Sequence, residues 1–422
     1  MNRLFGPQAV AAGLRASTLL FRFALMFFLA RSVSLETLGV FGLYWAGLQL
    51  ACTLLTLDVY AHTTRLLLNG SNNRVVLLSL HFGFVVLAFL SIGPMVAILF
   101  YFNIQNVTFF IVVFFVIHLA FEVLASEVGR LLVPLGKPLA SNLVLFLRTA
   151  VWVAPLVVGL EAGLLQPTIV TILLFWLAGS VLAVVLAFFV LFSVSGRFYP
   201  LFSLKWCQDA LMSAWLFLMA TLVFRGVLGL DRFLVESFLG IEVVGIYALY
   251  ASVSLGVLGL IESGVSAWRF PDLLAAIQEK NVPRAFSCLR VFVKQNLIAS
   301  AGLMSSVAIL FPVAIWFFLD EVYRQHISAF FILVLGVFFY CASMPFHYVI
   351  YSFREDRFLL IIYSISLVIM FGLANFFLAD SGVLGATSML AASLSFIAFL
   401  RVIGGVLLMR RLKRRYAIPV NG

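Results

Sequence analysis

The chain has 422 residues, of which 64% are hydrophobic and 10% are charged, and its formal net charge is +10. A soluble core of this size could not hide so much apolar surface, which excludes a soluble globular protein and indicates an integral membrane protein. The apolar runs lack the polar alternation of a membrane barrel, so the expected fold class is all-α.

Twelve apolar segments are long enough to cross a bilayer as helices, which takes about 20 residues each. The predicted spans lie near residues 10–34, 39–61, 75–101, 107–131, 139–160, 168–193, 209–230, 239–263, 293–319, 326–350, 358–379 and 383–409. The four cysteines are far apart and have no paired spacing, so neither a disulfide framework nor a metal site is expected. No catalytic residue and no cofactor is predicted.

Basic residues are distributed unequally between the two sides of these spans. Of the 27 lysines and arginines, 20 fall at the termini and in the even-numbered connections, and three fall on the opposite side. This asymmetry predicts that both termini are cytoplasmic, and it explains the positive charge without a nucleic-acid partner. The basic segment 410–416 is interpreted as an anchor for the last helix, with anionic lipid as an alternative ligand. An amphipathic helix in the plane of the membrane is expected near residues 268–290.

An internal repeat divides the chain into two halves. The stretch "LETLGVFGLYWA" at 35–46 aligns with "IEVVGIYALYAS" at 241–252. We therefore expect six-helix halves at 1–196 and 209–422, joined by a cytoplasmic linker at 197–208. Because six crossings return the chain to the same side, a pseudo-two-fold axis along the membrane normal should relate the two bundles, with substrate between them.

Four arginines lie inside predicted spans, where each costs about 2.5–3.5 kcal/mol at a helix centre. They are Arg22, Arg148, Arg225 and Arg401. Arg22 and Arg148 are predicted to face a substrate; the alternative is a structural ion pair with Asp58 or Glu122. Arg225 and Arg401 lie nearer the membrane surfaces, and we expect them to extend toward the headgroups.

The repeat also contains acid and base pairs with a spacing of seven residues. Asp58 and Arg65 recur as Glu262 and Arg269. Each pair should share a helix face, which suggests a cytoplasmic gate of salt bridges that break on opening. Direct contact of these side chains with substrate is the alternative.

Three acids are candidates for proton or ion coupling: Asp58, Glu122 and Glu127. A buried carboxylate can carry a proton across the membrane, although a hydrogen-bonded structural acid is the other interpretation. Guanidinium groups bind phosphate bidentately and do not lose their proton, so the embedded arginines indicate an anionic ligand with phosphate as the leading class. This reasoning leaves phosphate-bearing lipids, nucleotides and carboxylates open.

Two stretches resemble the Wzx-type oligosaccharide flippases of the multidrug/oligosaccharidyl-lipid/polysaccharide exporter superfamily. They are "RFALMFFLARSVSLETLGVFGLY" at 22–44 and "LDRFLVESFLGIEVVGIYALY" at 230–250. The resemblance implies alternating-access transfer of undecaprenyl-diphosphate-linked oligosaccharide, as in O-antigen and lipopolysaccharide synthesis, to the periplasmic leaflet of the bacterial inner membrane. It matches Arg22, Arg148 and Arg225 to the charged cavity of such proteins. A monomer in contact with membrane lipids and with polysaccharide polymerase machinery is also expected.

Three other functions remain open at this stage. A drug or cation antiporter of the same superfamily would need uncompensated carboxylates in its cavity. A membrane polysaccharide polymerase or ligase would need an extended external region, and a lipid scramblase would be indifferent to the sugar. For a flippase, the membrane potential alone supplies about 2.3 kcal/mol per charge and 100 mV, so a coupling ion is not required.

Overall fold

The computed structural model describes residues 7–68, 73–103 and 109–416, and these residues form helices and short connections without any strand. Within these described ranges, eleven helical segments are long and apolar enough to cross a membrane. They do not include α9 (Leu204–Val227), which occupies the predicted seventh span. The prediction of an all-α, multi-pass membrane protein is confirmed.

The chain forms two compact units, Met1–Leu218 and Met219–Gly422. The boundary lies within α9, and the first residues of this helix overlap the predicted linker at 197–208. The domain limits expected from the repeat stay a prediction.

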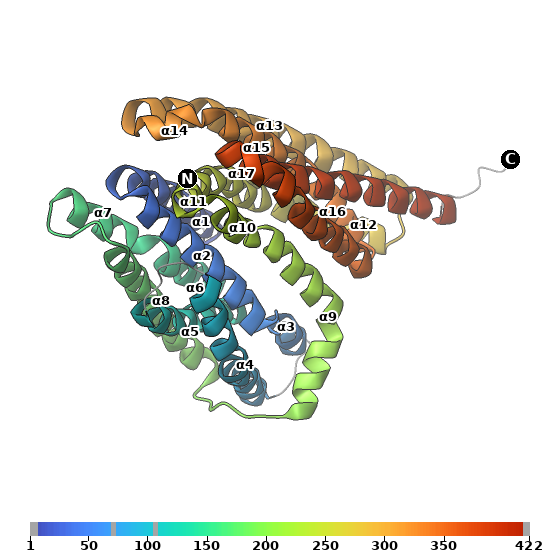
Figure 1. The fold of residues 1–422 in the computed structure, drawn as a ribbon. Coiled ribbons are helices and arrows are strands. Elements are labelled where there is room, and N and C mark those ends of the chain that lie inside the picture. Colours follow the sequence, from blue (N-terminus) through green and yellow to red (C-terminus); the bar gives the residue numbers. More distant parts are fainter. Residues whose placement is uncertain (1–6, 69–72, 104–108, 417–422) are drawn as a thin grey trace, which may run out of the picture. The chain divides into compact units, whose positions relative to one another are not determined.

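The helices of the N-terminal unit run from blue to green in Figure 1. They are α1 (Pro7–Ser32), α2 (Leu35–Thr56), α3 (Tyr60–Leu68), α4 (Arg74–Asn103), α5 (Phe109–Leu132), α6 (Pro138–Phe146), the π-helical turn η1 (Leu147–Val151), α7 (Val153–Glu161), α8 (Ile169–Ser195) and the start of α9.

Helix α5 is central to this unit, since it packs against α2, α4, α6 and α8. Local chemistry sets the ends of the neighbouring helices. The Ser34 and Thr168 side chains cap α2 and α8 by accepting a backbone N–H three residues later. Gly196 ends α8 with a φ of 78°, a conformation that glycine adopts without strain. The apolar faces of α4, α5 and α8 then form a common core around Leu78 and Val128.

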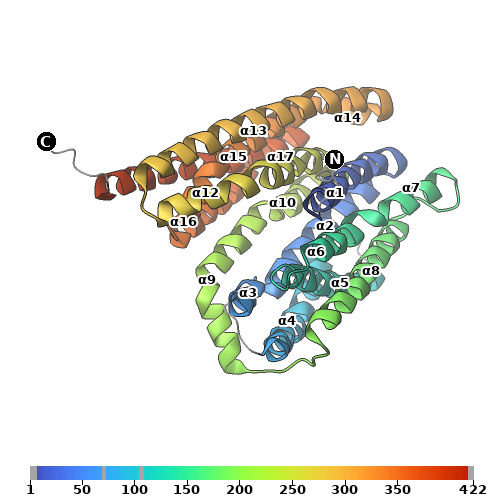
Figure 2. The same ribbon diagram turned by 180° about the vertical axis from the view of Figure 1, so that it is seen from behind.

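The C-terminal unit, seen from behind in Figure 2, contains the rest of α9 and the long helices α13 and α17. Its helices are α10 (Leu230–Leu239), α11 (Ile241–Ile261), the π-helical turn η2 (Glu262–Ser266), α12 (Ala267–Gln278), α13 (Val282–Phe318), α14 (Glu321–Gln325), α15 (Ile327–Ala342), α16 (Met344–Ser352) and α17 (Asp356–Tyr416).

Two glycines of the C-terminal unit have a clear physical role. Gly382, with φ 52° and ψ −134°, breaks α17 into two segments that correspond to the last two predicted spans. Gly336 of α15 lies against α17, and a Cβ there would come within 2.5 Å of Ala391 Cα. The absence of a side chain therefore allows α15 and α17 to pack closely.

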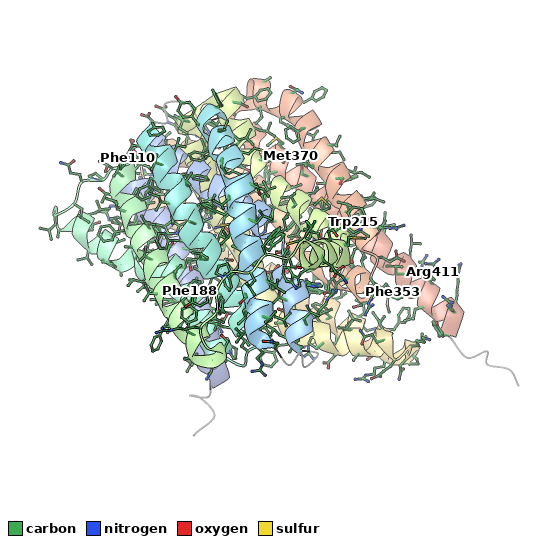
Figure 3. The ribbon with its side chains drawn as sticks, turned by 90° about the horizontal axis from the view of Figure 1, so that it is seen from below. Phe110, Phe188, Trp215, Phe353, Met370 and Arg411 are labelled. Carbon is green, nitrogen blue, oxygen red and sulfur yellow. The ribbon has the colours of Figure 1, made fainter. Side chains whose placement is uncertain are left out.

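Helix α12 occupies the segment in which a helix in the plane of the membrane is expected, and that membrane location stays a prediction. Leu273 and Ile277, which define the apolar side of α12, are buried within the protein, where α12 packs against α13 and α16. Figure 3 labels Arg411 near the end of α17, where its guanidinium lies 4.0 Å from the Glu355 carboxylate. The basic end of α17 thus continues the helical segment that follows Gly382.

Candidate functional site

Helix α5 carries two buried carboxylates of the N-terminal unit. Glu122 and Glu127 are 1% and 0% exposed. A buried carboxylate requires a positive partner or hydrogen-bond donors to offset the loss of water. Each glutamate has its own partners, so this helix contributes to two separate clusters.

The first cluster, which we call the Glu122 cluster, is built from α2, α5, η1 and α8. The Ser180 hydroxyl donates to Glu122 Oε1 at 2.6 Å, and Arg148 Nη1 lies 3.5 Å from Glu122 Oε2. His118 Nε2 lies 3.2 Å from Ser180 Oγ, and the Tyr44 hydroxyl lies 3.0 Å from His118 Nδ1. The donors of Tyr44, His118 and Ser180 are all satisfied if Tyr44 donates to His118, His118 to Ser180 and Ser180 to Glu122. One carboxylate and one guanidinium then balance each other's charge.

Arg148 reaches this cluster because it lies in the π-helical turn η1. The Trp152 indole N–H donates to the Arg148 carbonyl oxygen at 3.2 Å. A Cβ on Gly179 of α8 would lie 2.6 Å from Trp152 Cδ1 and 2.9 Å from the carbonyl oxygen that begins the turn. Glycine therefore lets the turn approach α8. Single π-helical turns are frequent at functional sites.

A row of three indoles extends from this turn toward α1. The centroids of Trp152 and Trp176 are 5.9 Å apart, and those of Trp176 and Trp45 are 4.9 Å apart. The Arg22 guanidinium lies 4.7 Å from the centroid of Trp45, a favourable cation–π distance. This tryptophan row brings Arg22 and the turn that carries Arg148 into one aromatic cluster. The Arg22 side chain is exposed, and that of Arg148 is 15% exposed.

The second cluster of the unit surrounds Arg130. Its Nη1 lies 3.0 Å from Asp58 Oδ1 and 3.4 Å from Glu127 Oε1, and its guanidinium lies 4.6 Å from the centroid of the Tyr60 ring. Glu127 Oε2 lies 3.1 Å from His81 Nε2. Two carboxylates share one guanidinium, so the charges balance only when one proton is added to the histidine or to a carboxylate.

The chain around Asp58 is not a continuous helix. Leu57 and Asp58 have φ values of 44° and 48°, and this left-handed pair separates α2 from α3. The expected shared face of Asp58 and Arg65 is therefore wrong, because the spacing rule assumed an uninterrupted helix. Among the described residues, Asp58 pairs with Arg130 and no ion pair joins it to Arg65. Whether Asp58 and Arg65 form a gate stays a prediction.

The corresponding acid of the C-terminal unit also lies at a helix irregularity. Glu262 begins the π-helical turn η2 and is exposed. Arg225 of α9, which is exposed as well, and Arg401 of α17 lie close enough for their charges to act on the Glu262 carboxylate. The C-terminal unit thus places one of the three predicted substrate-binding arginines beside an acid.

The second predicted gate pair is not formed in this structure. Arg269 Nε donates to the Gln295 side-chain oxygen of α13. Over the part of the chain that the structure describes, no ion pair joins Arg269 to Glu262. Their gating role stays a prediction, as does the substrate cavity between the halves.

Arg401 does not extend toward the membrane surface as expected, because it is 1% exposed. Its Nη2 donates to the Tyr363 hydroxyl at 2.6 Å and to the Tyr340 hydroxyl at 2.9 Å. The guanidinium carbon lies 4.4 Å from the Tyr340 centroid, 5.4 Å from that of Tyr363 and 5.9 Å from that of Phe224. These three rings form an aromatic cage that replaces water around the charge.

The described residues contain no group of three or more His, Cys, Asp and Glu side chains that could hold a metal ion. The four cysteines are free thiols.

The sequence matches no protein-family model and no curated protein. Three solved structures share its fold at 16% sequence identity. An inward-facing multidrug resistance MATE family transporter of the MOP superfamily has a TM-score of 0.73 and covers 96% of this chain and 99% of its own. An outward-facing multidrug resistance MATE family transporter has a TM-score of 0.65, and the match covers 97% of this chain and 98% of the transporter.

The third structure is a MOP superfamily transporter from Pyrococcus furiosus, with a TM-score of 0.61 and coverage of 96% and 97%. It is described as having a binding pocket of reverse polarity that suggests a different function. The chain therefore has the fold of MATE transporters, in which twelve helices form two bundles, and the predicted architecture is confirmed at this level.

Proposed function

We propose that the protein is a flippase that moves undecaprenyl-diphosphate-linked oligosaccharide from the cytoplasmic to the periplasmic leaflet of a bacterial inner membrane. The observation that carries this proposal is the tryptophan row, which has the Arg22 guanidinium against Trp45 at one end and the turn that carries Arg148 at the other. Guanidinium groups bind phosphate oxygens bidentately, and two of them suit a diphosphate. Exposed charges at span depth are costly in lipid, which favours a ligand-facing role for Arg22.

The shared fold supports transport by alternating access. Similar structures are known in inward-facing and outward-facing conformations. The Pyrococcus furiosus protein, with its pocket of reverse polarity, supports the view that this fold accepts ligands of different charge. In this proposal both termini are cytoplasmic, and the protein works as a monomer that passes its product to polysaccharide polymerase machinery.

Arg225 is the proposed phosphate contact of the C-terminal unit. Salt bridges of Asp58 and Arg65, and of Glu262 and Arg269, are proposed to form and break at the cytoplasmic gate during the transport cycle. In the present conformation Asp58 pairs with Arg130 instead. The gate proposal therefore requires an exchange of partners when the conformation changes.

The proposed proton-coupling site is the Arg130 cluster, with Asp58 and Glu127 as its acids. Its two carboxylates, single guanidinium and histidine require one proton for neutrality, which makes this cluster the best-supported carrier. Glu122 is the third candidate acid, and its ionised form is already balanced by Arg148.

A drug or cation antiporter is the second candidate, and the shared MATE fold favours it. The charge pattern supports the flippase, because the buried acids Glu122 and Glu127 are paired with basic side chains and a cationic drug would have to compete with those partners. A membrane polysaccharide polymerase or ligase is the alternative from a different class of protein. The solved structures that share this fold are transporters, which weighs against an enzyme.

Charge reversal at Arg22 tests the flippase proposal. Arg22→Glu should abolish surface polysaccharide in a producing strain at an unchanged protein level, because the aromatic cluster would then repel the diphosphate. Arg197→Glu, at an exposed arginine after α8, is the matched control and should retain the polysaccharide. Normal polysaccharide in Arg22→Glu, or export of cationic dyes by the wild-type protein, would overturn the proposal in favour of the antiporter.

A further inference from the structure

The Glu122 cluster is electrically balanced before any ligand arrives. Glu122 is 1% exposed and Arg148 15% exposed, and their closest charged atoms are 3.5 Å apart. An anionic ligand that binds Arg148 must therefore replace the Glu122 carboxylate as its counter-ion. An ionised Glu122 left without that partner would be a buried, uncompensated charge, which is strongly unfavourable.

We propose that an anion binding to Arg148 displaces Glu122, and that Glu122 takes up one proton from solvent as this happens. The ligand class is a phosphate diester, such as the diphosphate bridge between a lipid and a sugar. This inference rests on the proposed function, because it assumes that Arg148 receives the phosphate. Beyond the proposed function, we infer that the anion and the proton bind to the Glu122 cluster together and do not compete for it.

The exchange conserves charge and breaks no covalent bond. Before binding, the cluster holds the Arg148 cation and the Glu122 anion. After binding, it holds the Arg148 cation and one phosphate negative charge, and the new proton resides on Glu122 Oε2, the oxygen that faced Arg148. The Ser180 hydroxyl still donates to Oε1, so the neutral carboxyl group keeps a hydrogen-bond partner.

The groups packed around Glu122 favour this acid as the proton acceptor. His118 Nδ1 lies 3.0 Å from the Tyr44 hydroxyl and Nε2 lies 3.2 Å from Ser180 Oγ, so both nitrogens of its neutral ring have hydrogen-bond partners when Tyr44 donates to it and it donates to Ser180. The polar and titratable groups that face Glu122 are Tyr44 and Cys52 from α2, His118 from α5 itself, Arg148 from η1, and Ser180 and Trp176 from α8. His81 of α4 and Arg130 face Glu127 instead, and Asp58 pairs with Arg130.

Reciprocal linkage gives the sign of the pH dependence. If binding an anion promotes protonation of Glu122, protonation must promote anion binding to the same extent. Affinity should then rise by up to about tenfold per pH unit as the pH falls, until Glu122 is protonated in the free protein as well. An exchange in which proton and anion compete would give the opposite slope.

Titration calorimetry of the purified full chain in detergent tests the proposal, with farnesyl-diphospho-N-acetylglucosamine as the probe. A diphosphate diester is suitable because its own charge stays constant between pH 6 and 8, on the order of one negative charge per phosphate. Binding heats in two buffers with different ionisation enthalpies give the number of protons absorbed. The wild-type protein should absorb about one proton per probe molecule at the upper end of this range.

Glu122→Gln should bind the probe more tightly at high pH, without proton uptake and without pH dependence. Glu161→Gln, at an exposed acid at the end of α7, is the matched control and should behave as the wild type. Binding without proton uptake by the wild-type protein would overturn this inference and leave the flippase proposal intact. If neither the wild type nor Glu122→Gln binds the probe, the proposed function itself fails. The wild-type buffer comparison decides the question even if Glu122→Gln does not fold.

Discussion

Replacing Arg401 by methionine removes the charge at the centre of the aromatic cage in the C-terminal unit. The guanidinium donates to the hydroxyls of Tyr340 and Tyr363, and all three side chains are at most 4% exposed. A hydrogen bond to a charged group contributes about 1.5–3 kcal/mol. Breaking a buried charged network typically costs about 3–5 kcal/mol in total, and we expect this range for Arg401→Met.

A second substitution separates the loss of the charge from the loss of its partners. Arg401 is the partner of the Tyr340 hydroxyl in this structure, so Arg401→Met leaves that hydroxyl buried without one. Adding Tyr340→Phe removes the orphaned group, and the double variant should recover about 1–3 kcal/mol relative to the single variant. Tyr340→Phe alone should destabilise the protein, because Arg401 then loses an acceptor. The cycle of these variants should therefore be strongly non-additive.

Thermal unfolding of the purified protein in detergent, followed by circular dichroism, measures these effects. We expect Arg401→Met to lower the melting temperature by about 3–6 °C, and the double variant to lie between it and the wild type. An unchanged melting temperature for Arg401→Met, or strictly additive effects in the cycle, would refute the reasoning. Either result would mean that the cage does not compensate a buried charge.

Two further substitutions test the N-terminal unit. Gly179→Ala should cost about 1–3 kcal/mol and reduce binding at the Arg148 turn, because the new Cβ would overlap Trp152. Gly302→Ala, where nothing lies within 4 Å, should cause no loss, and equal melting temperatures for both variants would contradict the packing argument. Asp58→Asn keeps a residue that tolerates the left-handed backbone but removes the charge facing Arg130, which should cost about 1–2 kcal/mol. Amide hydrogen exchange in α3 should then accelerate about 5–30-fold. Unchanged exchange would argue against the idea that the ion pair of Asp58 and Arg130 holds α3 in place.

The features that depend on composition and periodicity could be predicted from the sequence alone. Hydropathy predicted the membrane helices, and the repeat drew attention to Asp58 and Glu262 at equivalent positions. The structure places a helix irregularity at both, one a left-handed pair and the other a π-helical turn. Spacing rules assume regular helices, so they could not predict either irregularity, and the expectation that Asp58 and Arg65 share a helix face was wrong for that reason.

The partners of the buried charges depend on contacts between distant segments. His81 and Glu127 are 46 positions apart, and neither position suggests the other in a single sequence. A hydropathy scale counts tryptophan simply as an apolar residue of a span. The sequence therefore did not indicate that Trp45, Trp152 and Trp176 lie together in one row. Arg401 was misjudged for a related reason, since depth along a span says nothing about which aromatic rings surround a side chain.

The tryptophan row has a consequence for how the protein can be observed. Three of its seven tryptophans have ring centroids within 6 Å of a neighbouring indole. The strong far-ultraviolet transition dipoles of indoles couple at such separations, so Trp45, Trp152 and Trp176 should add an exciton couplet to the far-ultraviolet dichroism of the chain. That couplet offers an intrinsic optical signature of the tryptophan row between Arg22 and the turn that carries Arg148, and it can be measured without any label.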